Sequence, residues 1–278
     1  MPIHDQGYRR YGGGKARGRG WTVIATAGLR GFFGKKAFLG LLLLSWAPFI
    51  VRAVQFYAAA SLPQAAFLAP RPETFRQFLD QQEVFVFFVT VYVGAGLIAN
   101  DRRANALQIY LSKPLTRGEY VFGKLAILMA FLLLVTWIPA LLLLFVQMAL
   151  AGNLTFLVNN FFLFPAITLF AFVQVIMVAA TMLALSSLSN SSRYVGIMYT
   201  AVLFFTQAIY GVVYAVTRST AMSWISPSAN LTQIGDVIFR LPPKYDTPWI
   251  VSAVVILVLV GGSAAILERR VRGVEVIT

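Results

Sequence analysis

Long apolar segments, separated by short polar ones, constrain this chain more than any other feature. Runs of about 18 or more apolar residues recur along the sequence, and each is long enough to cross a hydrocarbon core of roughly 30 Å. Hydrocarbon offers no hydrogen-bond partner to the backbone, so such runs cross a membrane as helices. The chain has 12% charged residues, against roughly 25% in an ordinary soluble domain. The sequence therefore predicts an all-α integral membrane protein.

Six apolar segments define a predicted transmembrane domain over residues 37–267. The second segment is short for a span, so a start before Val84 is the alternative for this span. Proline falls inside the first, third and fourth segments, at Pro48, Pro139 and Pro165, where it predicts kinks. The predicted spans are about 37–60, 84–100, 122–150, 161–187, 194–216 and 248–267.

The segments that flank the spans are basic. Residues 1–20 combine Gly with Arg and Lys and predict a disordered tail, for which we favour attraction to anionic lipid over RNA binding. Residues 21–36 mix apolar and basic side chains and predict an amphipathic helix in the membrane interface. Residues 268–278 are expected to form a cytoplasmic C-terminal tail.

Composition excludes several chemistries. The chain has no cysteine, and its one histidine is His4, so a thiol nucleophile and a His- or Cys-ligated metal within the membrane are excluded. The net charge of +13 does not indicate nucleic-acid binding, because the basic residues cluster at the ends of apolar segments. One side of the predicted topology holds 17 Lys and Arg and the other holds five. We therefore expect a multi-pass protein of the bacterial cytoplasmic (inner) membrane with both termini in the cytoplasm.

The stretch 57–61 allows a second interpretation. Its sequence, YAAAS, resembles a signal-peptidase site, but 36 residues precede the apolar run and Arg52 interrupts it, so we favour an uncleaved span.

Residues 71–83 and 226–240 are predicted as short helices at the outer interface. In the second of these, Ser226 is the expected N-cap and Pro227 the first helical residue.

Residues 101–124 interrupt the apolar pattern with five basic and two acidic residues. Ala104, Leu107 and Leu111 recur at helical spacing, so residues 101–112 predict a short helix, which Pro114 ends.

A second helix is expected directly afterwards. Thr116 and Glu119 have the spacing of a capping box, and Leu115 and Tyr120 that of a hydrophobic staple. Two stop and start signals so close together favour a rigid elbow that docks a soluble partner over a solvated loop that only anchors two spans.

The sequence GAGLIANDRRANALQIYLSKPLTRGEYVFGK, residues 94–124, resembles the segment between the second and third spans of type-2 ATP-binding-cassette (ABC) exporter permeases. That family usually has Glu and a Gly-Thr pair before the short helix, where this chain has Asp101 and no Gly-Thr. The positions that carry the resemblance are Gly94, Gly96, Asp101, Leu107, Leu111, Pro114, Thr116, Arg117, Gly123 and Lys124.

The resemblance implies that residues 101–112 are a coupling helix, which fits a cleft on a separate ATPase. It implies a dimer of ABC ATPase subunits and a second permease, identical or homologous. The chain has no Walker motif, so ATP and Mg²⁺ are expected in the partner, with no cofactor and no enzyme activity in this chain. The implied coupling residues are Asp101, Arg102, Arg103, Asn105, Leu107, Gln108, Tyr110 and Leu111, and the elbow residues are Pro114, Thr116 and Glu119.

The predicted spans contain no Asp or Glu well inside them. Ion-coupled transporters typically use buried carboxylates or His as relays, so the energy for transport is expected to enter through the elbow. Arg52 is the one predicted intramembrane charge. It could meet an anionic headgroup, but we favour a snorkelling side chain or a pair with Glu83. Further candidates for a substrate path, which could equally hold helices together, are Thr90, Tyr92, Gln174 and Gln207.

Together these features predict the permease subunit of an ATP-driven exporter that moves an amphiphilic or lipid-linked substrate outward. A non-transporting scaffold subunit of an ABC-like complex is the alternative, since one fold supports several functions. A membrane-embedded lipid-modifying enzyme would need clustered His, Asp or Glu at a membrane face, and the sequence offers only scattered carboxylates.

Overall fold

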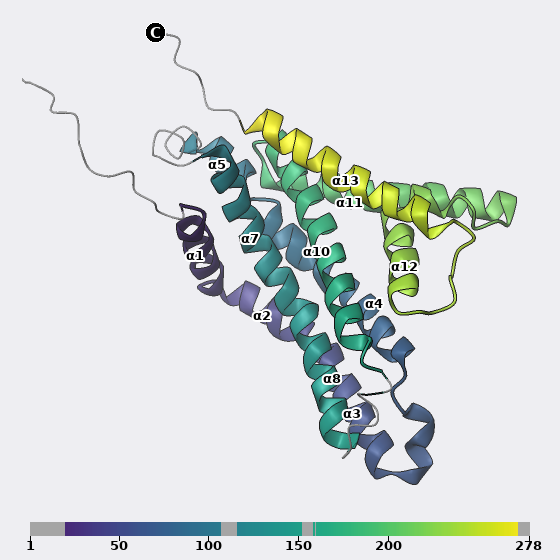
Figure 1. Ribbon diagram of the computed structural model, residues 1–278. Coiled ribbons are helices and arrows are strands. Elements are labelled where there is room, and N and C mark those ends of the chain that lie inside the picture. Colours follow the sequence, from purple (N-terminus) through teal and green to yellow (C-terminus); the bar gives the residue numbers. More distant parts are fainter. Residues whose placement is uncertain (1–19, 107–115, 152–157, 159, 272–278) are drawn as a thin grey trace, which may run out of the picture.

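The computed structural model describes residues 20–106, 116–151, 158 and 160–271, and this part of the chain is helical and contains no strand (Figure 1). The predicted all-α fold is therefore confirmed. The elements are α1 (Gly20–Phe33), α2 (Lys36–Ser45), α3 (Ala47–Ser61), η1 (Pro63–Leu68), α4 (Pro72–Val89), η2 (Thr90–Gly94), α5 (Ala99–Arg103), α7 (Arg117–Val135), α8 (Trp137–Ala151), α10 (Leu163–Leu188), α11 (Ser192–Thr217), η3 (Ser223–Ile225), α12 (Pro227–Ile238) and α13 (Trp249–Arg270).

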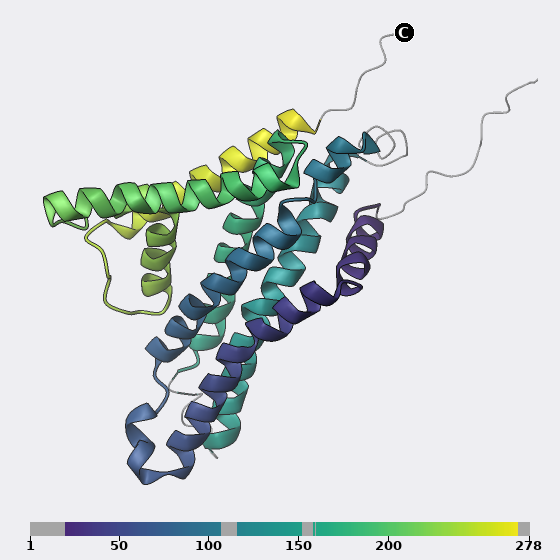
Figure 2. The same cartoon turned by 180° about the vertical axis from the view of Figure 1, so that it is seen from behind.

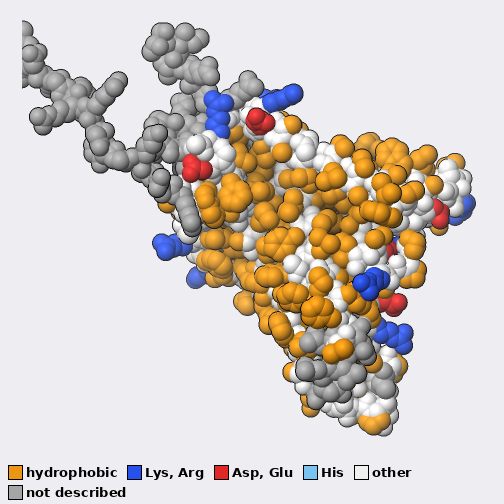
Figure 3. All heavy atoms as spheres, in the orientation of Figure 1, with side chains coloured by type: hydrophobic (Ala, Val, Ile, Leu, Met, Phe, Trp, Pro, Cys, Tyr) orange, Lys and Arg blue, Asp and Glu red, His pale blue; other side chains and the backbone are white. Residues whose placement is uncertain are grey.

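Six helical stretches in the described residues are long and apolar enough to cross a membrane. The shortest has 22 residues, which at 1.5 Å per residue covers about 33 Å. Figure 3 shows extensive hydrophobic surface on one face, with few charged side chains, most of them near its margins. The stretches are Lys36–Ser61, Pro72–Arg103, Arg117–Ala151, Leu163–Leu188, Ser192–Thr217 and Trp249–Arg270. The six predicted spans are therefore all present as helices, and the protein is a multi-pass membrane protein.

Helix α10 lies at the centre of the bundle. It contacts α7, α13 and the three elements of the second span, α4, η2 and α5. Helix α1 packs along α7, and α3 packs along α8. Helices α11 and α13 diverge from the line of α7 and α8, and α12 lies beneath them (Figures 1 and 2). The C-terminal end of α13 lies at the same end of the molecule as α5, which we call the α5 end (Figure 1).

Two of the three prolines coincide with interruptions. The first span divides into α2 and α3 at Trp46, with Pro48 in the first turn of α3. The third divides into α7 and α8 at Thr136, just before Pro139. Pro165 lies in the first turn of α10, which continues unbroken. First-turn amides have no intrahelical acceptor, so proline there needs no kink.

The second span starts earlier than predicted. Helix α4 begins at Pro72 and runs without interruption through residue 83, so 71–83 is not a separate outer helix but the first half of the span. The predicted apolar face is present, because Phe75, Phe78 and Leu79 are fully buried. The structure bears out the open alternative of a start before Val84. The sequence did not locate that start because polar residues on the other faces of α4 lower the local hydropathy, whereas tertiary burial decides where the helix can continue.

Two glycines, Gly28 on α1 and Gly123 on α7, allow these helices to pack closely against each other. A methyl group on Gly28 would overlap the side chain of Ile127. A Cβ on Gly123 would lie 3.0 Å from Ile24 Cβ and 3.1 Å from the carbonyl oxygen of Trp21. A helix is thus present over most of the predicted 21–36, as α1, which ends at Phe33 and packs closely on the third span, while its place in the membrane interface stays a prediction.

Substitution of Gly123 by Leu is expected to displace α1 from α7, because the backbone of α1 at Trp21 occupies the required space. The native chain lacks cysteine, so a single Ala25→Cys substitution, at a buried position of α1, provides a reporter. Maleimide labelling of this cysteine should become fast in Gly123→Leu. Gly118→Leu is the matched control, since no atom lies within 4 Å of that site, and equal labelling of both variants would contradict the packing.

Candidate functional site

The second span leaves regular α-helical geometry before it reaches the predicted coupling segment. The π-helix η2 is followed by a turn at residues 95–98 and then by α5. π-helical turns inside helices often occur at functional sites. Ser186 of α10 satisfies the interrupted backbone: its hydroxyl accepts from the N–H groups of Ile98 and Ala99, both at 3.1 Å, and donates to the carbonyl of Ala95 at 2.9 Å.

Charged contacts then fasten α5 to its neighbours. The guanidinium of Arg102 donates to the carbonyl of Ser187 on α10. Asp101 accepts from the Tyr120 hydroxyl at 2.7 Å and forms an ion pair with Lys124 at 2.7 Å, both on α7. Tyr120 is fully buried and Lys124 is 8% exposed, so the ion pair is shielded from water. The start of the predicted coupling segment is therefore held on spans three and four.

The segment after α5 differs from the prediction. Residues 101–112 were expected to form one helix, but α5 ends at Arg103 and Asn105 has a φ of 52°. Asn tolerates this left-handed conformation better than most residues, which explains why the helix stops there. The other predicted coupling and elbow residues, Leu107, Gln108, Tyr110, Leu111 and Pro114, lie outside the described part of the chain.

The predicted capping box at the start of α7 is confirmed. The N–H of Glu119 donates to Thr116 Oγ1 at 3.2 Å, and the N–H of Thr116 donates to Glu119 Oε2 at 2.9 Å. These contacts satisfy two backbone donors at the helix start. Leu115, the other half of the expected staple, lies outside the described residues, while Tyr120 is used for the contact with Asp101.

A cavity of about 760 Å³ adjoins α5, between α1, the second span, α7 and the start of α11. Its wall combines cationic side chains, Lys35, Lys124 and Arg193, with apolar side chains such as Ile24 and Ile127. Such a cavity can receive a molecule that has both a polar and an apolar part.

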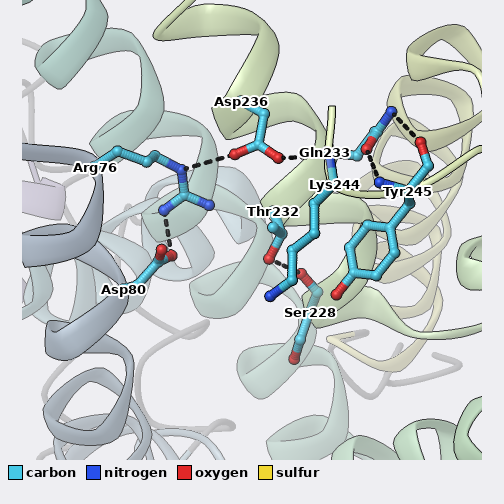
Figure 4. A network of polar contacts seen from close by, with 8 residues as sticks. All are labelled: Arg76, Asp80, Ser228, Thr232, Gln233, Asp236, Lys244 and Tyr245. Atoms are coloured by element: carbon cyan, nitrogen blue, oxygen red, sulfur yellow. Dashed lines mark hydrogen bonds and ion pairs between the residues drawn. The ribbon is translucent and has the colours of Figure 1, made fainter. Parts of the chain in front are cut away.

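A second polar network surrounds Arg76 on α4 (Figure 4). Arg76 was predicted in an outer loop, but its side chain is 2% exposed because α4 packs it against α10 and α12. Its guanidinium pairs with Asp80, lies 3.8 Å from the carboxylate of Asp236 and stands 4.4 Å from the ring centre of Phe170. A Cβ on Gly235 would overlap the guanidinium in its observed position, so glycine leaves the space that Arg76 occupies.

Helix α12 continues this network toward the last span. Asp236 accepts from the N–H of Lys244 at 3.2 Å, and burial raises the pKa of the Asp236 carboxyl, opposed by the charge of Arg76. Gln233 donates to the carbonyls of Tyr245 and Thr247, at 3.2 and 2.9 Å (Figure 4 draws the first). The network therefore connects α4, α12 and the approach to α13. The predicted caps of α12, Ser226 and Pro227, are present.

The five candidate substrate-path residues do not line one common cavity. Arg52 donates to Gln55 at 2.9 Å and to Gln81 at 3.4 Å, so it does not pair with Glu83. Gln207 accepts from the N-cap of α12, at 2.6 Å from Ser226 Oγ. Thr90 is fully buried, Tyr92 lines the cavity beside α5, and Gln174 lines a separate cavity.

Contrary to the prediction, acidic residues do lie inside one span. Because the second span begins at Pro72, it contains Asp80 and Glu83 as well as Glu73 and Asp101 near its two ends. Asp80 is paired with Arg76, whereas Glu83 Oε1 is buried without a hydrogen-bond partner. The source of energy therefore cannot be inferred from a lack of acidic residues in the spans.

Sequence reasoning missed the groups that support the site. Ser186 and Ser187 lie at the predicted end of the fourth span, and nothing in the local sequence indicated that they contact other helices. Lys124 and Tyr120 were noted only within local patterns, although their spacing of one helical turn on α7 places them together for Asp101.

Comparison with known proteins identifies one family. Residues 39–267 match the family model described as ABC-2 family transporter protein. No curated protein matches the sequence.

Removal of the Ser186 hydroxyl tests how the α5 end is supported. Ser186→Ala leaves three buried backbone groups without that partner and is expected to lower the free energy of unfolding by about 1–3 kcal/mol. Ser187→Ala is the matched control, because among the described residues its buried hydroxyl donates to the carbonyl of Ala184 in the same helix and to no other helix. Denaturant unfolding in detergent should separate the two variants, and equal losses would contradict the assigned role.

Substitution of Arg76 by Ala is expected to lower the free energy of unfolding by roughly 3 kcal/mol, because it removes the buried cation that faces Asp80 and Asp236. Gln77→Ala, at an exposed position of the same helix, should change it by less than about 0.5 kcal/mol. Denaturant unfolding again measures both. If Arg76→Ala left the free energy of unfolding unchanged, the network would not stabilise α12 on α4.

Proposed function

The chain belongs to the ABC-2 family of transporter proteins, and on that premise we propose that it is the membrane subunit of an ATP-driven exporter. The matched residues 39–267 include the described parts of all six spans except short segments at the two ends. The family makes the chain a permease subunit of an ABC transporter that pairs with an ABC ATPase. The direction of transport and the route of coupling are proposals.

We propose that the segment that starts at Asp101 couples the permease to the ATPase. The observation that carries this proposal is the attachment of α5, through Asp101 to Lys124 and Tyr120 and through Arg102 to Ser187. A force applied beyond Arg103 would reach α7 and α10 directly, since these contacts are short and largely buried. A segment that served only as a solvated tether would need no such attachment.

ATP and Mg²⁺ are assigned to the partner, so this chain carries neither catalysis nor a cofactor. Its contribution is mechanical: closure of the ATPase dimer would move α5 and, with it, the third and fourth spans. Coupling of this kind requires a stiff element between the two subunits and a polar, exposed docking surface. Arg103 and Arg117 meet the second requirement, because both are exposed at the α5 end.

The proposed cargo is an amphiphilic or lipid-linked molecule that moves outward. The 760 Å³ cavity beside α5 supports this, because cationic and apolar side chains share its wall. Lys35 and Arg193 would face a polar or anionic group, and Val23, Ile24 and Val91 would face an apolar one.

Two permeases are proposed in the working unit. Helix α11 buries only Val195, Gly196, Tyr199 and Tyr210 and extends away from the bundle (Figure 2). Its remaining apolar side chains, such as Phe204 and Phe205, each 67% exposed, are available to lipid and to a second permease. The fold itself does not distinguish an identical second copy from a homologous one.

The proposed orientation places both termini in the cytoplasm of a bacterium, with the protein in the inner membrane. Arg76 was counted among five basic residues in the outer loops. Because it is buried in the network on α4, four basic residues remain in the outer loops. By the same criterion Lys124, which is buried and paired with Asp101, leaves the other count, so 17 becomes 16. A ratio of 16 to 4 is still more asymmetric than 17 to 5, which supports the proposed orientation.

Charge reversal at Arg103 tests the docking surface, because this exposed side chain can be changed without disturbing a contact shown within the chain. Arg103→Glu is expected to weaken binding of the copurifying ATPase about tenfold and to reduce its activation by the permease. Arg270→Glu, exposed at the same end on α13, is the matched control. Binding is measured between detergent-solubilised permease and purified ATPase.

Equal weakening by Arg103→Glu and Arg270→Glu would contradict a docking role of the α5 segment. Movement of a fluorescent phospholipid across liposomes that contain the complex distinguishes a transporter from the scaffold alternative. A complex that binds and hydrolyses ATP without moving this probe or other amphiphiles would favour the scaffold.

A further inference from the structure

A small cavity of about 90 Å³ lies between α4, α10, α11, α12 and α13, apart from the α5 end. Most of its wall is apolar, with side chains such as Val86, Met177 and Leu231. Five polar residues also line it: Glu83 of α4, Gln174 and Thr181 of α10, Tyr199 of α11 and Ser228 of α12. None of these residues takes part in the attachment of α5.

Glu83 is an acid whose charge is not balanced by an ion pair within the described residues. Its Oε1 atom is buried and has no hydrogen-bond partner. Arg76, on the same helix, is paired with Asp80 and lies near Asp236. Arg52 contacts two glutamine side chains instead. A carboxyl group in this position needs either a proton or a cation that enters the cavity, and the cation is the alternative that the other acceptors of the wall favour.

Gln174 supplies a second, independent observation. Its side chain is 1% exposed, faces the cavity and has an Oε1 atom without a hydrogen-bond partner. Buried acceptors are nearly always satisfied in folded proteins, so an unsatisfied one that faces a cavity indicates a missing donor. Thr181, another residue of the wall, already donates its hydroxyl to the carbonyl of Met177 at 2.8 Å.

We propose that this cavity binds a primary ammonium group carried on an aliphatic chain. An ammonium group has three donors, which match acceptors on Glu83, Gln174 and Tyr199 better than a single hydroxyl would. Its positive charge balances the Glu83 carboxylate, and the apolar wall accommodates the attached carbons. A volume of about 90 Å³ admits the ammonium group and a few methylene groups.

Other occupants fit this wall less well. An anion would be repelled by Glu83 and would leave the two acceptor oxygens without donors. A divalent cation prefers six or more oxygen ligands, and the polar side chains of this wall supply too few. Water alone would satisfy hydrogen bonds, but Glu83 would then have to be protonated, and the apolar part of the wall would have no partner.

The inference rests on the cavity and not on the proposed export activity. A primary ammonium group can reach the cavity on a freely diffusing amine or on the headgroup of a phospholipid such as phosphatidylethanolamine. The chemistry of recognition is the same for both sources. Binding is measured without ATPase or transport, so a negative result would leave the proposed function untouched, and failure of transport would leave this site untouched.

The test uses the full chain in phosphatidylcholine nanodiscs and butylammonium as the probe, with butan-1-ol as the neutral analogue. Butylammonium should raise the thermal unfolding midpoint with a saturable dependence on concentration, and butan-1-ol at the same concentrations should not. Glu83→Gln, which keeps the size of the side chain, should weaken butylammonium binding about tenfold or more. Gln174→Leu should weaken it as well.

Glu73→Gln is the matched control, since it makes the same change at an exposed position of α4 and should leave binding unaltered. Replacement of phosphatidylcholine by phosphatidylethanolamine separates the two sources: a weaker effect of butylammonium identifies the headgroup as a competitor, and an unchanged effect identifies a free amine as the ligand. Equal shifts by butylammonium and butan-1-ol, or full binding by Glu83→Gln with an unchanged fold, would overturn the proposal.

Discussion

Every backbone N–H and C=O inside a membrane needs a partner, and this requirement determines how the second span can end. The span passes from α4 into a π-helix and a turn while it is still buried, as shown by Val93 and Ile98. Ser186 supplies the contacts that the interrupted helix cannot supply for itself. The position of α5 therefore depends on α10, and any movement of α5 is expected to act on α10 as well.

Helix α10 has the same central role along its whole length. It contacts the interrupted second span through Ser186, the small cavity through Gln174 and the buried guanidinium through Phe170. It is also buried around much of its circumference and unbroken over 26 residues, whereas the first three spans are each interrupted. An unbroken buried helix that contacts broken ones can move as one rigid body, so changes of shape within the subunit are expected mainly at the breaks in its neighbours.

The parts of the site that depend on local sequence could be predicted. The Thr116–Glu119 capping box and the Ser226 cap were found as expected, because each involves residues within one helical turn. The buried position of Arg76 could not be predicted, because it depends on Asp236 and Phe170, which are distant in sequence. The start of the second span was left open before Val84 and could not be located for the same reason: polar side chains on α4 find partners only after the helices have packed.

The sequence by itself determined the number of spans, the helical class, the caps and the clustering of positive charge at the ends of apolar segments, since these follow from hydropathy and from contacts between near neighbours. Only the tertiary structure decided which polar residues support α5, which charge is buried, and that Glu83 and Gln174 face one cavity. These are contacts between different helices, and a one-dimensional pattern does not specify which faces meet. The physical reason is that the free energy of a buried polar group is set by the partner that packing brings to it.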